Sequence, residues 1–445
     1  MNKKTRSENL YWVWLAESLG AGNRHITKLI DIFGSAFSVY SASEEDICRL
    51  DFLTDQMSRK LTNKSLQRAY DIIDYCALNN IGILSFADEN YPDRLKLLQD
   101  PPAVLYYKGT LPKFDSKVCI GVVGTRKMSE YGKRSAYRIS YELASAGAII
   151  VSGMALGIDS VSACGALAAD GKTVAVLGCG IDTVYPSQHV KLQRTIEERG
   201  IVLTEFSPGT KPIGINFPIR NRIISGLSLG TLVVEADDKS GAMITAKCAL
   251  MQGRGVFALP GNIDESNSIG TNTLIRDGAT AVTCAEDILS NYELLYGKHL
   301  NYSALTFAKS TFDEELCDRI LERLNIATRP YKKDKREQID TSYQLRPTKK
   351  PTVPEDVTRP TTNATIPTKR KAIVEPKKSD GSEKALSELS EEHRNIFREF
   401  PIDRAVTMDD LCKSGYSVSQ VMSAITVLEM KGLISTLPGN LYIRR

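Results

Sequence analysis

Four short segments of this sequence combine glycine with hydroxyl or guanidinium side chains, a combination that suits phosphate binding. In the first segment, the apolar run Val118–Val123 ends in Gly124, Thr125 and Arg126, and an amphipathic helix is predicted from about residue 131 to 146. Amides at a helix start and the Thr125 hydroxyl can donate to a phosphate, and Arg126 can clamp it. The alternative is a tight turn with a surface arginine. The spacing is neither the dinucleotide motif G-x-G-x-x-G nor the P-loop G-x-x-x-x-G-K-[ST].

The second segment, residues 151–159, repeats the order of strand, glycine turn and helix. Ser152 and the amide near Gly153 are expected just outside the carboxyl end of a strand, where doubly wound sheets bind anions. Asp159 is expected to cap or orient this turn in preference to an acid–base role.

The third segment, residues 216–224, places Arg220, Asn221 and Arg222 at the start of a helix. A helix dipole disfavours positive charge at that end, so exposed guanidinium groups there need another reason, and a bound polyanion supplies one. The alternative is a structural ion pair between an arginine and a carboxylate.

The fourth segment, residues 235–246, follows a strand and begins a helix at Ser240 and Gly241, with Ser240 as the expected N-cap. Lys191 and Lys211 are further candidates for contact with an anion, although each is more simply a solvated lysine. No histidine lies in the four segments, and their acids lack the spacing of metal ligands. We therefore predict no catalytic residue, no metal and no cofactor.

The elements that must position these segments are short apolar runs bounded by glycine, proline or polar residues, with helical stretches between most of them. This pattern indicates a parallel, doubly wound sheet of the α/β class, on which the four segments meet at one edge. The runs are Val118–Val123, Ala148–Val151, Thr173–Leu177, Gly200–Leu203, Gly230–Val234 and Val256–Ala258.

Composition divides the chain of 445 residues into four regions. Residues 8–85 are predicted to form a small helical domain, 86–298 the sheet domain, 328–385 a disordered basic linker and 386–445 a winged helix. A short helix is expected over 313–325. In the winged helix, helices are predicted at 391–400, 407–414 and 417–431, with Thr407 as an N-cap, and a hairpin at 433–436 and 441–444.

The net charge of +4 is unevenly distributed. Between residues 329 and 378 there are 14 Lys and Arg against 6 Asp and Glu, which leaves 43 against 47 for the rest. An anion site in the folded parts must therefore be a local patch.

The nine cysteines form no C-x-x-C pair, so we expect no disulfides. No apolar run approaches the ~20 residues of a membrane span, so we expect a cytoplasmic protein.

Six motifs, in order, resemble the motif set of the DprA/Smf family. They cover about residues 86 to 290, and together they are far more specific than any one alone. The motifs are Val-Val-Gly-Thr-Arg (122–126), Ser-Gly-Met-Ala-Leu-Gly-Ile-Asp (152–159), Phe-Pro-Ile-Arg-Asn-Arg-Ile-Ile (217–224), Ser-Gly-Ala-Met-Ile-Thr-Ala (240–246), Leu-Pro-Gly-Asn (259–262) and Gly-Thr-Asn-Thr-Leu-Ile-Arg-Asp-Gly-Ala (270–279).

The resemblance implies an extended Rossmann fold that binds single-stranded DNA, loads RecA recombinase onto it and helps displace single-strand-binding protein, as in natural transformation. Arg126 falls on the family's DNA-binding arginine, and Arg220 and Arg222 fall on its Arg-Asn-Arg motif. It also implies a homodimer whose surface overlaps the RecA contact. On this chain that surface includes Asn272, Leu274, Ile275 and Ala281.

Two other hypotheses differ in class. Phosphoribohydrolases share the fold class, but their Pro-Gly-Gly-x-Gly-Thr-x-x-Glu motif is absent; a carboxylate such as Glu235 facing a pocket without a basic partner would favour a nucleotide-binding or hydrolytic enzyme. A regulator of double-stranded DNA would read a groove through the helix at 417–431. That helix carries Lys431 as its only base, so we expect it to dock a partner instead.

Overall fold

The computed structural model describes residues 3–326, residues 389–401 and scattered positions from there to residue 444. The chain divides into two units, Met1–Thr348 and Lys349–Arg445. The linker expected over 328–385 lies outside the described residues.

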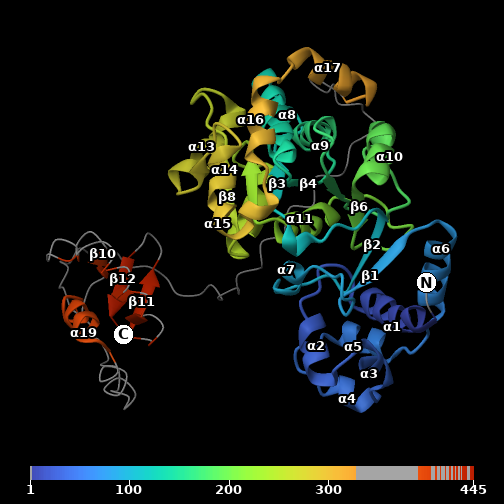
Figure 1. The fold of residues 1–445 in the computed structure, drawn as a ribbon. Coiled ribbons are helices and arrows are strands. Elements are labelled where there is room, and N and C mark those ends of the chain that lie inside the picture. Colours follow the sequence, from blue (N-terminus) through green and yellow to red (C-terminus); the bar gives the residue numbers. More distant parts are fainter. Residues whose placement is uncertain are drawn as a thin grey trace, which may run out of the picture. The chain divides into compact units, whose positions relative to one another are not determined.

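A nine-stranded sheet forms the centre of the first unit, in the order β1-β2-β6-β5-β4-β3-β7-β8-β9 (Figure 1). Neighbouring strands from β6 to β9 along this order run parallel, whereas β2 is antiparallel to both β6 and β1. The strands are β1 (Gly82–Ser85), β2 (Val104–Gly109), β3 (Cys119–Val123), β4 (Ile149–Ser152), β5 (Thr173–Val176), β6 (Ile201–Thr204), β7 (Gly230–Val233), β8 (Gly255–Ala258) and β9 (Thr280–Ala281).

The strand order reverses between β3 and β7. From β3 the chain moves outward through β4 and β5 to β6, and it then returns to place β7 on the other side of β3. The six predicted apolar runs form β3 to β8, and the α/β fold class is confirmed. In sheets of this kind a crevice opens at the carboxyl ends of the strands where the order reverses.

Helices cover both faces of this sheet, which explains why the central strands are apolar along their whole length. One face packs against α8 (Glu130–Ser145), α9 (Ile158–Ala168) and α10 (Val190–Arg199). The other packs against α7 (Asp93–Lys96), α11 (Asn216–Leu227), α12 (Gly241–Met251) and α13 (Ser266–Arg276). The amphipathic helix expected from about residue 131 is therefore α8.

Six helices precede the sheet, and α1 and α6 pack on its β1 edge (Figure 1). Their buried side chains, among them Trp14 and Leu29, continue the core beneath one face of the sheet. These helices are α1 (Lys3–Leu19), α2 (Ile26–Phe33), α3 (Ala36–Ser41), α4 (Glu44–Cys48), α5 (Asp55–Thr62) and α6 (Gln67–Leu78).

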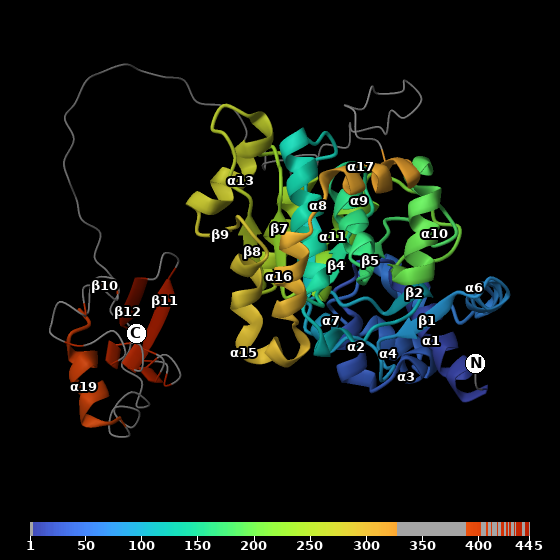
Figure 2. The ribbon, with the colours of Figure 1, turned by 45° about the horizontal axis from the view of Figure 1, so that its top comes forward.

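A helical segment after β9 forms an outer layer. It consists of α14 (Glu286–Leu289), α15 (Glu293–Tyr296), α16 (Tyr302–Ser310) and α17 (Glu314–Arg323). Figures 1 and 2 both place α16 beside α8 and α17 over α9. An ion pair of 3.0 Å between Lys133 Nζ and Asp318 Oδ1 joins α8 to α17, which is the helix expected over 313–325.

The second unit contains α19 (Glu391–Arg398) and an antiparallel sheet in the order β10-β12-β11. Its strands are β10 (Val406–Thr407), β11 (Ile434–Leu437) and β12 (Leu441–Arg444). The hairpin of the predicted winged helix is present, and Thr407, the expected N-cap, is the last residue of β10. Most residues of the helices expected at 407–414 and 417–431 lie outside the described residues.

Gly165 lies where α9 packs against α8, so a substitution at this position tests the packing of the two helices. A Cβ atom there would lie 2.5 Å from the Tyr137 carbonyl oxygen and 3.1 Å from the Ser140 Cβ. We expect Gly165→Ala to lower the free energy of unfolding by about 1–3 kcal/mol, the usual penalty for overpacking, as measured by urea denaturation.

The matched control is Gly297→Ala. Its new Cβ would contact only the Glu293 Cγ, at 3.7 Å, so we expect a change within about 0.5 kcal/mol. Equal urea midpoints for the Gly165 variant and the unmodified protein would contradict the packing described.

Candidate nucleic-acid interface

A cleft of about 360 Å³ opens where the strand order reverses, at the carboxyl ends of β3 and β7. It is formed by the loop after β3, the turn before α9 and the starts of α11 and α12. Of the residues proposed from the sequence, it brings together Gly124, Thr125, Arg126, Arg220, Asn221, Ser240 and Gly241.

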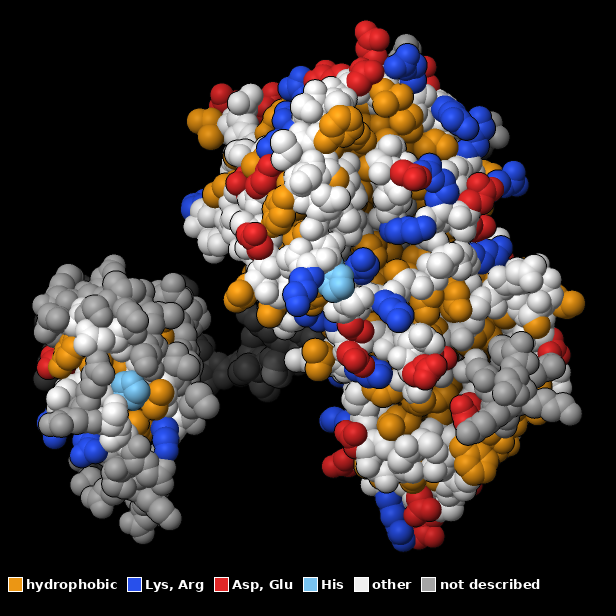
Figure 3. Space-filling view, viewed as in Figure 1, with side chains coloured by type: hydrophobic (Ala, Val, Ile, Leu, Met, Phe, Trp, Pro, Cys, Tyr) orange, Lys and Arg blue, Asp and Glu red, His pale blue; other side chains and the backbone are white. Residues whose placement is uncertain are grey.

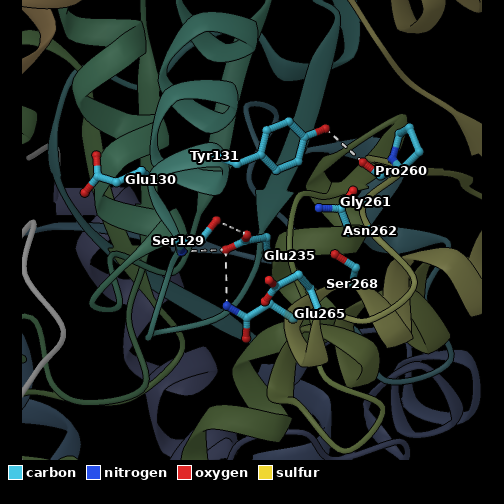
Figure 4. A pocket seen from close by; sticks show the side chains of 10 residues that line it. Ser129, Glu130, Tyr131, Glu235, Pro260, Gly261, Asn262, Glu265 and Ser268 are labelled. Atoms are coloured by element: carbon cyan, nitrogen blue, oxygen red, sulfur yellow. Dashed lines mark hydrogen bonds between the residues drawn. The ribbon is translucent and has the colours of Figure 1, made fainter.

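The start of α8, which the sequence suggested as a phosphate site, is occupied by a carboxylate of the protein itself. Glu235 is buried after β7, and its Oε2 accepts a hydrogen bond of 3.0 Å from the Ser129 amide (Figure 4). Its Oε1 accepts from the Ser129 hydroxyl, which in turn accepts from the Gly132 amide at 3.0 Å. Because an anion is already held there, a phosphate at this helix end would have to displace Glu235.

The turn before α9 is also held by a carboxylate of the protein, that of Asp159. Its Oδ2 accepts from the Gly153 amide at 3.0 Å, while the Ser152 hydroxyl donates to the Asp159 carbonyl at 3.2 Å. Burial raises the pKa of the Asp159 carboxyl, and the nearby Arg220 guanidinium opposes that shift. Asp159 thus orients the turn as expected, whereas Ser152 and Gly153 are buried and committed to internal hydrogen bonds.

The start of α12 is different, because its N-cap position is not used internally. Ser240 precedes the helix without a side-chain cap bond, and its buried hydroxyl has no partner among the described residues. The first amides of the helix, Gly241 and Ala242, have no acceptor within the helix. An oxyanion placed in the cleft would satisfy all three donors.

Arg126 supplies the exposed arginine of the cleft. It is exposed, and no ion pair within the described part of the chain involves it. Its guanidinium carbon lies 5.8 Å from the centroid of the Phe217 ring, which itself packs at 5.4 Å on Tyr185. The Thr125 hydroxyl accepts from the Lys127 amide at 3.2 Å, so it shapes the loop that presents Arg126.

The sequence-based expectation of exposed guanidinium groups on α11 is wrong for Arg220. Its side chain is only 4% exposed, and it donates to the Gly153 carbonyl at 2.7 Å and to the Val176 carbonyl. Burial lowers its pKa to about 10, so it remains charged at neutral pH. Arg220 forms the floor of the cleft, and Asn221 beside it donates to the Gly241 carbonyl at 3.4 Å.

Arg222 is also buried, on the side of α11 away from the cleft, and here the alternative of a structural ion pair is confirmed. Its Nη2 pairs with Glu205 Oε2 at 2.5 Å, and its Nε lies 3.5 Å from Asp100 Oδ2. The other oxygen of Glu205 accepts from the Gly22 amide at 3.1 Å. Arg222 therefore joins α11 to the turn between α1 and α2.

The remaining candidates lie outside the cleft. Lys191 and Lys211 are exposed but do not line it. On α13, Leu274 is buried in the core, and Asn272 is engaged with both backbone groups of Gly261 at 3.2 and 3.0 Å. Ile275 is half-buried, and Ala281 is exposed on the edge strand β9; the dimer surface remains a prediction.

Lys and Arg lie interspersed with Asp and Glu on the face of the first unit seen in Figure 3.

In the described parts of the chain, no group of three or more His, Cys, Asp or Glu side chains could hold a metal ion. None of the described helices is both long and apolar enough for a membrane span.

Comparison with known proteins gives consistent matches. The family described as DNA recombination-mediator protein A matches residues 58–293, and the DprA winged helix domain matches residues 381–440. DNA processing protein DprA of Bacillus subtilis is 41% identical over 223 residues, 50% of this chain and 74% of that protein. Protein Smf of Escherichia coli is 45% identical over 221 residues, 49% of this chain and 58% of that protein. The X-ray structure of DNA processing protein A from Streptococcus pneumoniae superimposes with a TM-score of 0.54 and 34% identity, covering 63% of this chain and 97% of that one.

The ion pair of Arg222 predicts a pH-dependent loss of stability. Arg222→Ala leaves the Glu205 carboxylate buried without its main partner, and we expect a loss of about 3–5 kcal/mol near neutral pH. Burial already raises the pKa of Glu205, and Arg222 opposes that shift. Without the arginine the folded protein holds the Glu205 proton more tightly, so the loss should shrink as pH falls toward the ordinary glutamate pKa of about 4.3.

Urea denaturation at several pH values measures this loss. The control is the double variant Arg222→Met with Glu205→Gln, which leaves no buried charge at position 205 and should be more stable near neutral pH than Arg222→Ala alone. A loss for Arg222→Ala that does not change with pH would show that the pairing with Glu205 is not its cause.

Proposed function

Since this chain belongs to the family of DNA recombination-mediator protein A, whose relatives are named DprA and Smf, we propose that it binds single-stranded DNA without sequence preference and loads RecA recombinase onto the bound strand. The observation that carries the binding proposal is the open start of α12. There the partnerless Ser240 hydroxyl and two free amides face a cleft that also contains the exposed Arg126.

Phosphate is the ligand that this donor set suits best. A helix start, a hydroxyl and a guanidinium all donate to oxygen, and the dipole of α12 favours a negative charge. Phosphates occur at every nucleotide, so such contacts carry no sequence information. Lys127, exposed on the same loop, would add a second positive charge along the strand.

The partners of this function are proposed from the resemblance, and the free edge of the sheet supports them. Strand β9 is the last strand in the sheet order, and its outer edge offers unpaired backbone groups to another chain. Ile263, in the loop after β8, and Ile269, on α13, are exposed. We propose that this edge forms the interface of a homodimer and that the interface overlaps the surface contacted by RecA. We also propose that the protein helps to displace single-strand-binding protein and that it does so in the cytoplasm.

A nucleotide-binding or hydrolytic enzyme is the second candidate, and one observation favours it. Glu235 lines a pocket, and no ion pair in the described residues involves it. Its carboxylate is nevertheless engaged by Ser129, so we propose a structural and not a catalytic role. Release of a free base on incubation with nucleoside monophosphates would reverse this preference.

Because the proposed contacts are made mainly to the phosphates of the DNA backbone, the affinity for DNA should depend steeply on salt concentration. The affinity for oligo-dT should fall linearly in a plot of log K against log salt concentration. Arg126→Ala should weaken binding about ten-fold or more and reduce the slope by about one, because one phosphate contact is lost. Fluorescence anisotropy titrations at several salt concentrations measure both quantities.

The matched control for this titration is Lys191→Ala, which removes a positive charge outside the cleft and should change affinity little. A shallow salt slope for the unmodified protein, or unchanged affinity for Arg126→Ala, would contradict the proposed binding mode.

A further inference from the structure

A second pocket, of about 630 Å³, lies beside the cleft at the carboxyl ends of β7 and β8 (Figure 4). Residues from the start of α8, the turn after β8 and the start of α13 line it. They include Ser129, Tyr131, Glu235, Asn262, Glu265 and Asn267. None of the contacts proposed above for phosphate uses this pocket.

One wall of the pocket is a fixed aromatic ring. Tyr131 lies in the first turn of α8, and its hydroxyl donates to the Pro260 carbonyl at 2.8 Å (Figure 4). The hydrogen bond holds the ring in place, while 42% of the residue remains exposed. A fixed, half-exposed ring is the kind of surface on which nucleic-acid bases stack.

The polar groups of the pocket exclude a phosphate and favour a neutral ligand with hydrogen-bond donors. Its lining contains the carboxylates of Glu235 and Glu265 and no lysine or arginine. The Glu130 side chain points away from these carboxylates (Figure 4) and pairs with Lys133 at 2.7 Å. Asn262 and Asn267 add amide groups. Carboxylates accept hydrogen bonds from exocyclic amino groups, as in their pairing with the amino group of cytosine.

The pocket and the phosphate cleft share one wall, the loop between β3 and α8. Lys127 lines the cleft, and its carbonyl accepts a 2.9 Å hydrogen bond from the side-chain Nδ2 of Asn267, a residue that lines the pocket. A strand held by its phosphate in the cleft would therefore have this pocket next to it.

We propose that the pocket binds a nucleobase of the strand whose phosphate lies at α12, and that it prefers a base with an exocyclic amino group to thymine. This inference rests on the proposed function. It adds a modest base preference to backbone binding, with Tyr131 as the stacking surface and Glu265 as the accessible acceptor.

The experiment compares oligo-dC and oligo-dT of equal length by fluorescence anisotropy near neutral pH. We expect the unmodified protein to bind oligo-dC at least about five-fold more tightly than oligo-dT, which is the effect of one well-placed base contact. Tyr131→Ala should weaken oligo-dC binding about five-fold or more through loss of stacking. Tyr131→Phe, which keeps the ring but loses the bond to Pro260, should weaken oligo-dC binding less than Tyr131→Ala does.

Two further variants test the hydrogen-bond acceptor of the pocket and the specificity of the Tyr131 effect. Glu265→Gln changes an exposed side chain that is not part of the core, and it should reduce the preference for oligo-dC without weakening oligo-dT binding. Tyr70→Ala removes an equally exposed tyrosine, 46% exposed on α6, and should change neither affinity.

The outcomes separate the two proposals. If the unmodified protein binds neither oligonucleotide, the proposed function fails. If it binds both with equal affinity, and Tyr131→Ala and Glu265→Gln change nothing, the function stands and the base pocket is overturned.

Discussion

The hydrogen bonds between the Glu235 carboxylate and Ser129 determine where this domain can receive an anion. On a doubly wound sheet, several helices begin at the edge where the strand order reverses, and each start attracts negative charge. Here Glu235 occupies the start of α8, and Asp159 holds the turn before α9; both carboxylates belong to the protein itself. The start of α12 keeps its donors free, so a phosphate should find the most hydrogen-bond donors in the cleft in front of this helix.

The arginines of α11 illustrate a division between shaping a site and contacting a ligand. Arg220 is buried beneath the cleft and fixes the backbone at Gly153, whereas Arg222 faces away and joins α11 to the turn at Gly22 through Glu205. The α1–α2 turn and the cleft are thereby connected through one helix. Arg126, on a loop and stacked near Phe217, is left as the guanidinium that a ligand can reach.

Much of the fold could be predicted from the sequence, because buried strands and amphipathic helices leave local patterns. The edge strands β1 and β9 could not, since they are short and neither is buried along its whole length. Nor could the burial of Arg220 and Arg222, because it depends on partners distant in sequence, such as Glu205 and Gly153. Tyr131 was missed for a similar reason. Its position in a first helical turn was visible, but the bond to Pro260 that fixes the ring spans 129 residues.

The most direct test of the account is a crystal structure of the chain with bound oligo-dT. We expect a phosphate group within hydrogen-bond distance of the Ser240 hydroxyl and the Gly241 amide, with the Arg126 guanidinium on the same phosphate and Glu235 still bonded to Ser129. A phosphate at the start of α8 with Glu235 displaced, or a strand bound away from the β3–β7 cleft, would contradict it.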